Sequence, residues 1–323
     1  MPNFIDLDKI NQVDLRLILD NAKKMKQDLV LGKLSDVLRG KNLAMLFEKS
    51  STRTRISFEV GMNQLGGNAI VMNASNTQIG KGEPIADTAK VFSRYVDIAM
   101  LRVNDHETIA DFAKYGDIPV INALSDFSHP CQIMASIMAI EEKIGDVKGK
   151  ILTWFGDANN VLNSYIHGAL AFGYELRIAV PADYDFCDAE IEKAVKNGAN
   201  IKIYCEEVEV GAFKGGVKVS GGVKDAARGC DVLITDTWIS MGQNSEKDEA
   251  RRLEKIAELM PYQINQNLMD LAGNGAIFTH CLPAYRGYEV TSDVIDGNSS
   301  IVFDEAENRL HVQKAILLYC LNF

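Results

Sequence analysis

Short, uniformly apolar segments recur along this chain, and longer amphipathic stretches separate them. Segments of this kind are typical of strands in a sheet that is covered on both faces. The stretches between them predict helices, for example over residues 52–65, 87–95, 107–115 and 188–197. Strands that alternate with helices indicate a layered α/β structure built on parallel sheets.

The apolar segments fall into two series, which suggests two domains in a chain of 323 residues. The first series comprises 42–47, 68–72, 97–103 and 119–122, and the second comprises 151–155, 176–180, 200–204, 231–235, 276–279 and 300–303. Each series predicts a doubly wound domain, with a central parallel sheet flanked by helices. We expect a helix over 131–143 between the domains and another over 305–318, and the pattern alone does not show to which domain the last helix returns.

The charge balance limits the partners of this chain. It carries 34 Lys and Arg against 44 Asp and Glu, a formal net charge of −10. This charge argues against nucleic acid or an anionic membrane as a global partner. The six cysteines form no CxxC pair, and the five histidines show no zinc spacing. The first residues carry acidic side chains and no apolar signal-peptide core, and no apolar run approaches the length of a membrane span. We therefore expect a cytoplasmic protein with reduced thiols, without metal or cofactor.

One local pattern predicts a phosphate site. The run FEKSSTRTR at 47–55 follows an expected strand and opens an expected helix, with Ser50 or Ser51 as its N-cap. Free N–H groups at a helix start favour an anion, and Arg53 adds a planar cation suited to phosphate oxygens. Hydroxyl donors lie in the same turn: Ser51, Thr52 and Thr54. From these residues alone, a solvated helix cap with surface arginines is an equally good interpretation.

Four short motifs, spread over most of the chain, carry a resemblance to a known family. They are STRTR at 51–55, HPCQ at 129–132, DTWISMG at 236–242 and HCLP at 280–283. The first is similar to the carbamoyl phosphate signature of the aspartate/ornithine transcarbamylases, and the combination resembles the ornithine branch of that family. The resemblance implies a carbamoyl phosphate-binding domain over 1–130 plus 306–323, and an ornithine-binding domain over 131–305.

The resemblance implies one set of residues that binds carbamoyl phosphate: Ser51, Thr52, Arg53, Thr54, Gln78, Arg102, His129, Gln132, Cys281, Leu282 and Arg309. His129 would donate to the carbamoyl oxygen, which gains negative charge in the transition state. The family inserts the loop of Gln78 into a neighbouring subunit, which implies a homotrimer with sites at subunit interfaces. Taken singly, Arg102 fits a surface ion pair and His129 fits a helix cap.

A second implied set binds L-ornithine: Asn160, Asp236, Ser240 and Met241, with Asn159 as a less certain neighbour. The family's catalytic positions correspond to Arg102, His129, Asp236 and Cys281. A carboxylate suits the ammonium group of an amino acid, and the backbone of the SMG segment suits its carboxylate. Taken alone, Asp236 also fits a turn or cap, and Cys281 fits inert packing.

The implied reaction transfers the carbamoyl group of carbamoyl phosphate to the δ-amine of L-ornithine, giving L-citrulline and phosphate, in arginine metabolism. Within the family, putrescine or N-acetylornithine carbamoyltransferases are the alternatives. From another class, a nicotinamide-dependent α/β dehydrogenase fits the fold, but no GxGxxG follows Phe155. A non-catalytic binding protein is a further alternative on grounds of fold.

Overall fold

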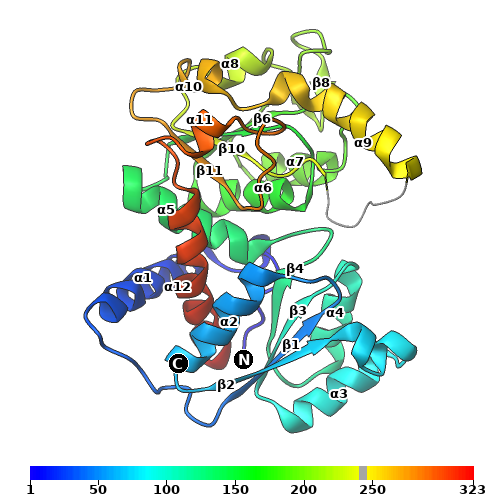
Figure 1. Cartoon of the computed structure of the whole chain (residues 1–323), viewed down its shortest axis with the longest axis vertical. Coiled ribbons are helices and arrows are strands. Elements are labelled where there is room, and N and C mark those ends of the chain that lie inside the picture. Colours follow the sequence, from blue (N-terminus) through cyan, green and yellow to red (C-terminus); the bar gives the residue numbers. More distant parts are fainter. Residues whose placement is uncertain (240–245) are drawn as a thin grey trace. The chain divides into compact units, whose positions relative to one another are not determined.

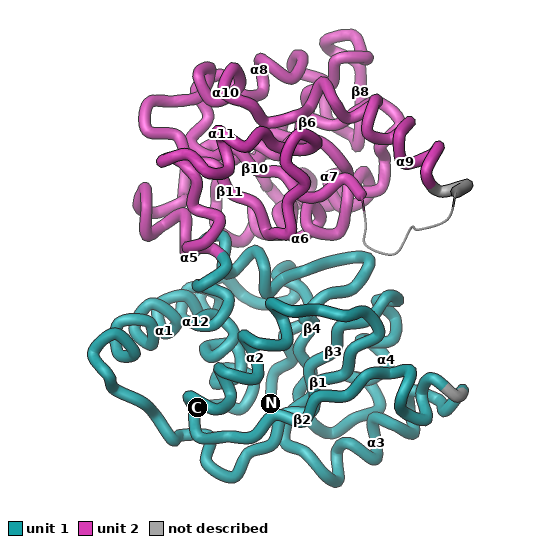
Figure 2. Tube along the Cα trace, viewed as in Figure 1, with its two compact units in different colours: residues 1–138, 306–323 teal, residues 139–305 magenta. Residues whose placement is uncertain are grey.

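The computed structural model describes residues 1–239 and 246–323, which form two compact units. Figure 2 shows unit 1, Met1–Met138 with Ala306–Phe323, and unit 2, Ala139–Glu305. The chain passes between the units inside two helices, α5 (Pro130–Ile144) and α12 (Val302–Leu321).

The sequence placed the first boundary at 130/131, the start of α5, whereas the units divide at 138/139, within that helix. None of the described helices is both long and apolar enough to cross a membrane.

Unit 1 is built on four parallel strands in the order β2-β1-β3-β4. The strands are β1 (Asn42–Phe47), β2 (Asn68–Asn73), β3 (Ile98–Arg102) and β4 (Val120–Leu124). Its helices are α1 (Gln12–Val30), α2 (Thr52–Gln64), α3 (Ile85–Tyr95) and α4 (His106–Tyr115), with short 3-10 turns at η1 (Leu7–Lys9), η2 (Ala74–Asn76) and η3 (Ile79–Lys81). The central strands β1 and β3 are almost wholly buried, as their apolar sequences predict, while the edge strand β2 is largely accessible.

Helices cover both faces of this sheet (Figure 1). On one face α3 and α4 pack together, and Phe112 of α4 joins the core formed with Leu46 and Leu101 of the sheet. On the other side lies α2, whose Gln64 accepts a hydrogen bond from Lys314 of α12 at 2.9 Å. The first helix, α1, buries Leu15, Ile18, Leu19 and Ala22, which recur at helical spacing along one side.

Unit 2 is built on five parallel strands in the order β11-β10-β5-β6-β7. The strands are β5 (Ile151–Phe155), β6 (Glu175–Ala179), β7 (Ile201–Tyr204), β10 (Val232–Thr235) and β11 (Ile277–His280), and β8 (Phe213–Lys214) and β9 (Val217–Lys218) form a separate antiparallel pair. The helical segments are α6 (Asn160–Phe172), α7 (Asp188–Lys196), α8 (Val223–Ala227), α9 (Glu246–Leu259), η4 (Met260–Tyr262), α10 (Gln266–Met269) and α11 (Ser292–Ile295). The pair α6 and α7 packs together, and α8 packs with α10 beside the core of the sheet.

The expected strand at 300–303 is wrong. Only Ser300 makes an isolated parallel bridge, to Phe278, and α12 begins at Val302. Ile301 and Val302 are buried while Phe303 is exposed, so this short apolar run is equally compatible with the start of a helix. Periodicity cannot separate these two cases in so short a run.

In both sheets the chain reverses its winding direction beside the first strand. Between β1 and β3 in unit 1, and between β5 and β10 in unit 2, successive connections leave in opposite directions. The carboxyl ends of such strand pairs are where open α/β sheets bind ligands, because the loops there diverge and leave a crevice. The segments that follow β1, β3, β5 and β10 are therefore the expected places for a ligand site.

Candidate active site

The phosphate pattern lies at the switch point of unit 1. Ser51, rather than Ser50, caps α2, and its Oγ accepts a hydrogen bond from the backbone N–H of Thr54 at 3.3 Å. Phe47, the last residue of β1, is in register with Arg102, the last residue of β3. The parallel register therefore brings Arg102 level with the start of α2, where helix N–H groups favour an anion.

Three long-range contacts bring Arg102 and Arg309 together at the start of α2. Arg53 acts with these two charges on His129, and we define Arg53, Arg102 and Arg309 as the arginine cluster. The hydroxyl Oγ1 of Thr54 accepts from Nη1 of Arg102 at 3.3 Å and from Nη2 of Arg309 at 3.2 Å. Nη1 of Arg309 also donates to the side-chain oxygen of Gln132. Strand β3 and helices α2, α5 and α12 thus each contribute to one site.

His129 lies beside the arginine cluster and is buried. The pKa of its imidazole is held well below the ordinary value of 6.5. Burial is the largest cause, and positive charges add to it in this order: Arg309, Arg102 and Arg53. His129 is therefore a neutral imidazole at neutral pH, able to donate one N–H without adding a further charge to the cluster.

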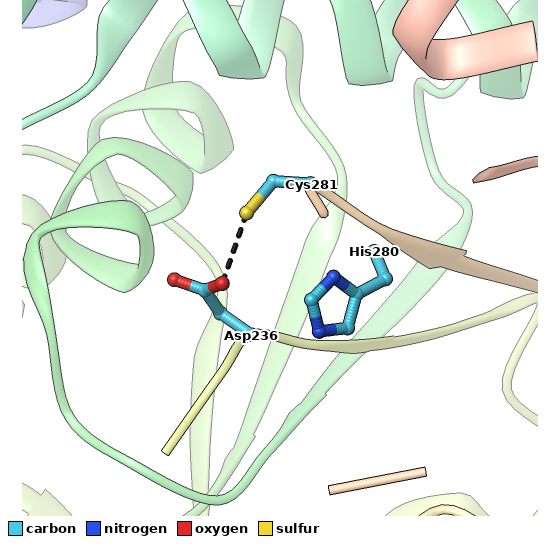
Figure 3. Close-up of side chains that lie close together, drawn as sticks. All are labelled: Asp236, His280 and Cys281. Carbon is cyan, nitrogen blue, oxygen red and sulfur yellow. Dashed lines mark hydrogen bonds between the residues drawn. The ribbon is translucent and has the colours of Figure 1, made fainter. Parts of the chain in front are cut away.

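In unit 2 a carboxylate cluster, which we define as Asn159, Asp236 and Cys281, lies at the carboxyl ends of β5, β10 and β11. The buried carboxylate of Asp236 accepts from Nδ2 of Asn159 at 3.1 Å and from Sγ of Cys281 at 2.9 Å. The backbone N–H of Thr237 donates to the same carboxylate at 2.7 Å. Figure 3 shows the thiol of Cys281 directed at Asp236, with the imidazole of His280 beside them.

A close contact between two strand ends shapes the carboxylate cluster. Gly156, directly after β5, has a φ of +110°, and the indole of Trp238, two residues after Asp236, packs against it. A Cβ at Gly156 would lie 2.4 Å from Nε1 of Trp238, so only glycine fits. This packing brings the turn of Asn159 and the turn of Asp236 together.

His280 supports the backbone beside Cys281. Its Nδ1 accepts from the backbone N–H of Leu282 at 2.8 Å, while Nε2 lies 3.5 Å from the buried carboxylate of Glu289. Leu282 has a left-handed φ of +57°, a conformation that this hydrogen bond helps to hold. Ligand atoms of Asp236, His280 and Cys281 lie within 4.8 Å of one another, and these hydrogen bonds already engage them.

Of the predicted residues, Arg53, Arg102 and Arg309 form the arginine cluster, and Asp236 and Cys281 belong to the carboxylate cluster. Beside the first lie Thr54, His129 and Gln132, and beside the second lies Leu282. Thr52 is exposed in the first turn of α2, and Asn160 is the first residue of α6. Asn159, which the sequence ranked below Asn160, both caps α6 and contacts Asp236. A residue that ends a βα turn and caps the following helix is a recognisable signal, but its contact with Asp236 is not.

Ser240 and Met241 lie outside the described residues. Gln78 is exposed between η2 and η3, and its side chain makes no hydrogen bond within 1–239 and 246–323.

Each of the two doubly wound α/β units carries a charged cluster at its switch point, where such sheets bind small ligands. Residues 2–142 match the family model described as the carbamoyl-P binding domain of aspartate/ornithine carbamoyltransferase, and residues 148–320 match its Asp/Orn binding domain. The chain belongs to the aspartate/ornithine carbamoyltransferase family, and it is a carbamoyltransferase.

Whole-chain relatives agree with this assignment. The ornithine carbamoyltransferase of Rhizobium johnstonii is 47% identical over 319 residues, which cover 99% of this chain and 98% of that protein. The solved structure of ornithine carbamoyltransferase from Pyrococcus furiosus matches with a TM-score of 0.86 and 42% identity, covering 98% of this chain and 96% of its own. The anabolic ornithine carbamoyltransferase from Campylobacter jejuni matches with a TM-score of 0.85 and 36% identity, covering 100% and 99%. The predicted family and α/β fold are confirmed, and the dehydrogenase alternative is set aside.

Proposed function

We propose that this enzyme transfers the carbamoyl group of carbamoyl phosphate to the δ-amine of L-ornithine, giving L-citrulline and phosphate. The choice of ornithine as the acceptor is supported by the buried carboxylate of Asp236, which Asn159 and Cys281 hydrogen-bond within the Asp/Orn binding domain. A carboxylate attracts the ammonium group of ornithine. It would repel the additional carboxylate of aspartate, the other acceptor in the family's name.

In this proposal the carbamoyl phosphate dianion binds at the N-terminus of α2. Ser51, Thr52, Arg53 and Thr54 hold the phosphate, Arg102 bridges the phosphate and the carbonyl oxygen, and Arg309 and Gln132 complete the site. Fixed guanidinium groups and a helix start supply local positive charge, so the acidic net charge of the chain is no obstacle. The neutral His129 donates to the carbamoyl oxygen where negative charge develops.

The amino-acid end of ornithine would bind to Asp236 and Asn160, with Ser240 and Met241 taking its carboxylate. The neutral δ-amine attacks the carbamoyl carbon near Cys281, the C–O bond to phosphate breaks, and the amine loses a proton. The main chain of Leu282 would contact the carbamoyl group. Positioning and electrostatic stabilisation supply the catalysis, with no covalent enzyme intermediate.

An acceptor panel tests this proposal. The purified enzyme is assayed with carbamoyl phosphate and, in turn, ornithine, putrescine, N-acetylornithine and aspartate, with product formation measured for each. We expect the highest kcat/KM with ornithine by at least about 100-fold, since an acceptor that leaves buried polar groups unpaired is strongly rejected. A higher value with any other acceptor would refute the assignment.

We further propose a homotrimer in which Gln78 of one subunit completes the site of its neighbour. Apolar side chains are exposed on α2 and on the edge strand β2, which pack beside each other: Ile56, Val60 and Ile70. Such exposed residues beside an open sheet edge support burial against another copy.

Subunit mixing tests the shared site. Gln78→Ala and Asp236→Asn subunits, each of low activity alone, are unfolded, mixed and refolded together. Hybrids should regain activity, because some sites then receive an intact Gln78 and an intact Asp236 from different chains. Sedimentation measures the assembly in parallel. A monomer, or hybrids no more active than the parents, would refute the proposal.

We also propose that the enzyme is cytoplasmic and acts in arginine biosynthesis. All six cysteines are free thiols, which supports a reducing compartment. The anabolic title of the Campylobacter jejuni relative supports the biosynthetic direction. Deletion of the encoding gene should then cause a requirement for arginine or citrulline that ornithine does not satisfy. Growth without either supplement would contradict the biosynthetic role.

A further inference from the structure

The chain just before His129 is held by a closed ring of four polar side chains, Asp6, His106, Ser125 and Ser128, which we call the Asp6 ring. The Asp6 carboxylate accepts from the hydroxyl of Ser128 and lies 3.2 Å from Nε2 of His106. Nδ1 of His106 lies 2.8 Å from Oγ of Ser125. The ring closes because the backbone N–H of Ser125 donates to the carbonyl of Ser128, and the backbone N–H of Ser128 donates to Oγ of Ser125.

The proton positions around the ring follow from its acceptors. Oγ of Ser125 accepts from the backbone N–H groups of Phe127 and Ser128, at 3.3 and 3.2 Å. Its hydroxyl proton is then directed to Nδ1 of His106, so Nε2 carries the imidazole proton and donates to Asp6. Each hydrogen bond of the ring thus has a defined donor and a defined acceptor.

Hydrogen bonds fix both the side chain and the backbone of Ser128. Besides its hydrogen bond to Asp6, its Oγ accepts from Nδ2 of Asn122 at 2.9 Å, and its carbonyl accepts from the N–H of Ser125 at 2.9 Å. Asp6, Asn122, Ser125 and Ser128 are all buried. Burying a carboxylate is costly, and replacing it with an apolar residue would usually be neutral or stabilising, so stability alone does not account for it.

We propose that Asp6 and His106 are positioning residues that set the orientation of His129 through Ser128. His129 lies between Ser128, fixed on its backbone and side chain, and Pro130, whose ring restricts the first turn of α5. Its side-chain direction therefore depends on the Asp6 ring. The inference deepens the proposed function, in which His129 acts on the carbamoyl oxygen.

Replacing Asp6 tests the ring. Asp6→Asn, and separately Ser128→Ala, should lower kcat by about 10–100-fold, because small misplacements of a catalytic group carry penalties of this size. The KM for carbamoyl phosphate should stay within about twofold, since the arginine cluster is untouched. Asp117→Asn, with an exposed carboxylate just after α4, is the matched control and should keep wild-type kinetics. Thermal melts establish that each variant is folded at the assay temperature.

Kinetics are measured with whichever acceptor the wild-type enzyme uses best, so failure of the ornithine assignment would show separately in the wild type. Folded Asp6→Asn and Ser128→Ala enzymes with wild-type kcat would overturn the positioning role. A parallel rise in the KM for carbamoyl phosphate with unchanged kcat would also overturn it, because it would assign the ring to the binding cluster.

Discussion

The thiol of Cys281 donates a hydrogen bond to the carboxylate of Asp236, with Sγ and Oδ1 2.9 Å apart. The two residues follow adjacent strands, β10 and β11, whose register brings their carboxyl ends level. The protein itself therefore holds the carboxylate toward Asn159 and Cys281. An acceptor site arranged in advance in this way loses little free energy in ordering itself on binding.

Asp236→Asn should lower kcat/KM for ornithine by about 10–100-fold, because a hydrogen bond to a charged group contributes about 1.5–3 kcal/mol. The KM for carbamoyl phosphate should change little. Steady-state kinetics with each substrate varied in turn provide the measurement, and Asp183→Asn, an exposed carboxylate in the same unit, serves as control. An equal loss in Asp183→Asn would show that total charge, not the site, is responsible.

Arg309→Lys should raise the KM for carbamoyl phosphate by about 10-fold or more. The guanidinium contacts Thr54 and Gln132 through two different nitrogens, and an ammonium group cannot reproduce this fork. Calorimetric titration with carbamoyl phosphate measures the loss directly. Arg94→Lys, in the exposed last turn of α3, is the matched control, and equal affinity in both variants would count against the cluster.

Gly156→Ala should both destabilise unit 2 and weaken ornithine binding. The new Cβ would lie 2.4 Å from Nε1 of Trp238, which is a steric clash. In addition, a residue with a side chain at the φ of +110° loses about 1–3 kcal/mol of stability through backbone strain. Gly149→Ala separates the two effects, since its φ is +76° but nothing lies within 4 Å of a Cβ there. Thermal melts and ornithine kinetics compare them, and equal ornithine KM values would exclude a role of the Trp238 contact in the site.

The apparent KM for ornithine should fall as pH rises from 7 to 8.5. The reactive form is the neutral δ-amine, and an alkyl ammonium of pKa about 10.4 is mostly protonated throughout this range, so the fall should reach up to about 30-fold. Initial rates at saturating carbamoyl phosphate test this. A flat profile with chemistry rate-limiting would contradict attack by the neutral amine.

His129 should make stability depend on pH in acid. Its pKa in the folded protein lies below the ordinary 6.5 of an unfolded chain, so the unfolded state binds the proton more readily. The resulting stability is complete above pH 6.5 and is lost as pH falls below that value. The melting temperature of the wild type should therefore drop more steeply below pH 6.5 than that of His129→Gln. Parallel curves would contradict the shifted pKa.

Local features of the structure were largely predictable. The strands of both sheets coincide with apolar runs to within a few residues, because buried parallel strands require continuous apolar sequence. Local chemistry also predicted that α2 is capped by Ser50 or Ser51, and the structure selects Ser51. The prediction of a strand at 300–303 was wrong, because a short apolar run carries no period that separates a strand from the start of a helix.

The roles in the site came from the motif resemblance, and the contacts that connect them came from the fold. Arg309 meets Thr54 across 255 positions of sequence, and Asn159 meets Asp236 across 77. Asp6 gave no sequence signal, because the hydroxyl of Ser128 that hydrogen-bonds to it lies 122 positions away in the chain. Contacts of this kind depend on strand order and register, which periodicity does not encode.

The amino-acid sequence was therefore sufficient for the α/β class and the helix start that suits a phosphate, which depend on neighbouring residues, and for the family, which depends on short motifs. Folding was needed to set the charge state of His129, the choice of Asn159 as the partner of Asp236, and the Asp6 ring. The physical reason is that burial, Coulomb interaction and hydrogen-bond direction depend on distances in space, and parallel sheets create those distances by joining strand ends that are far apart in the chain.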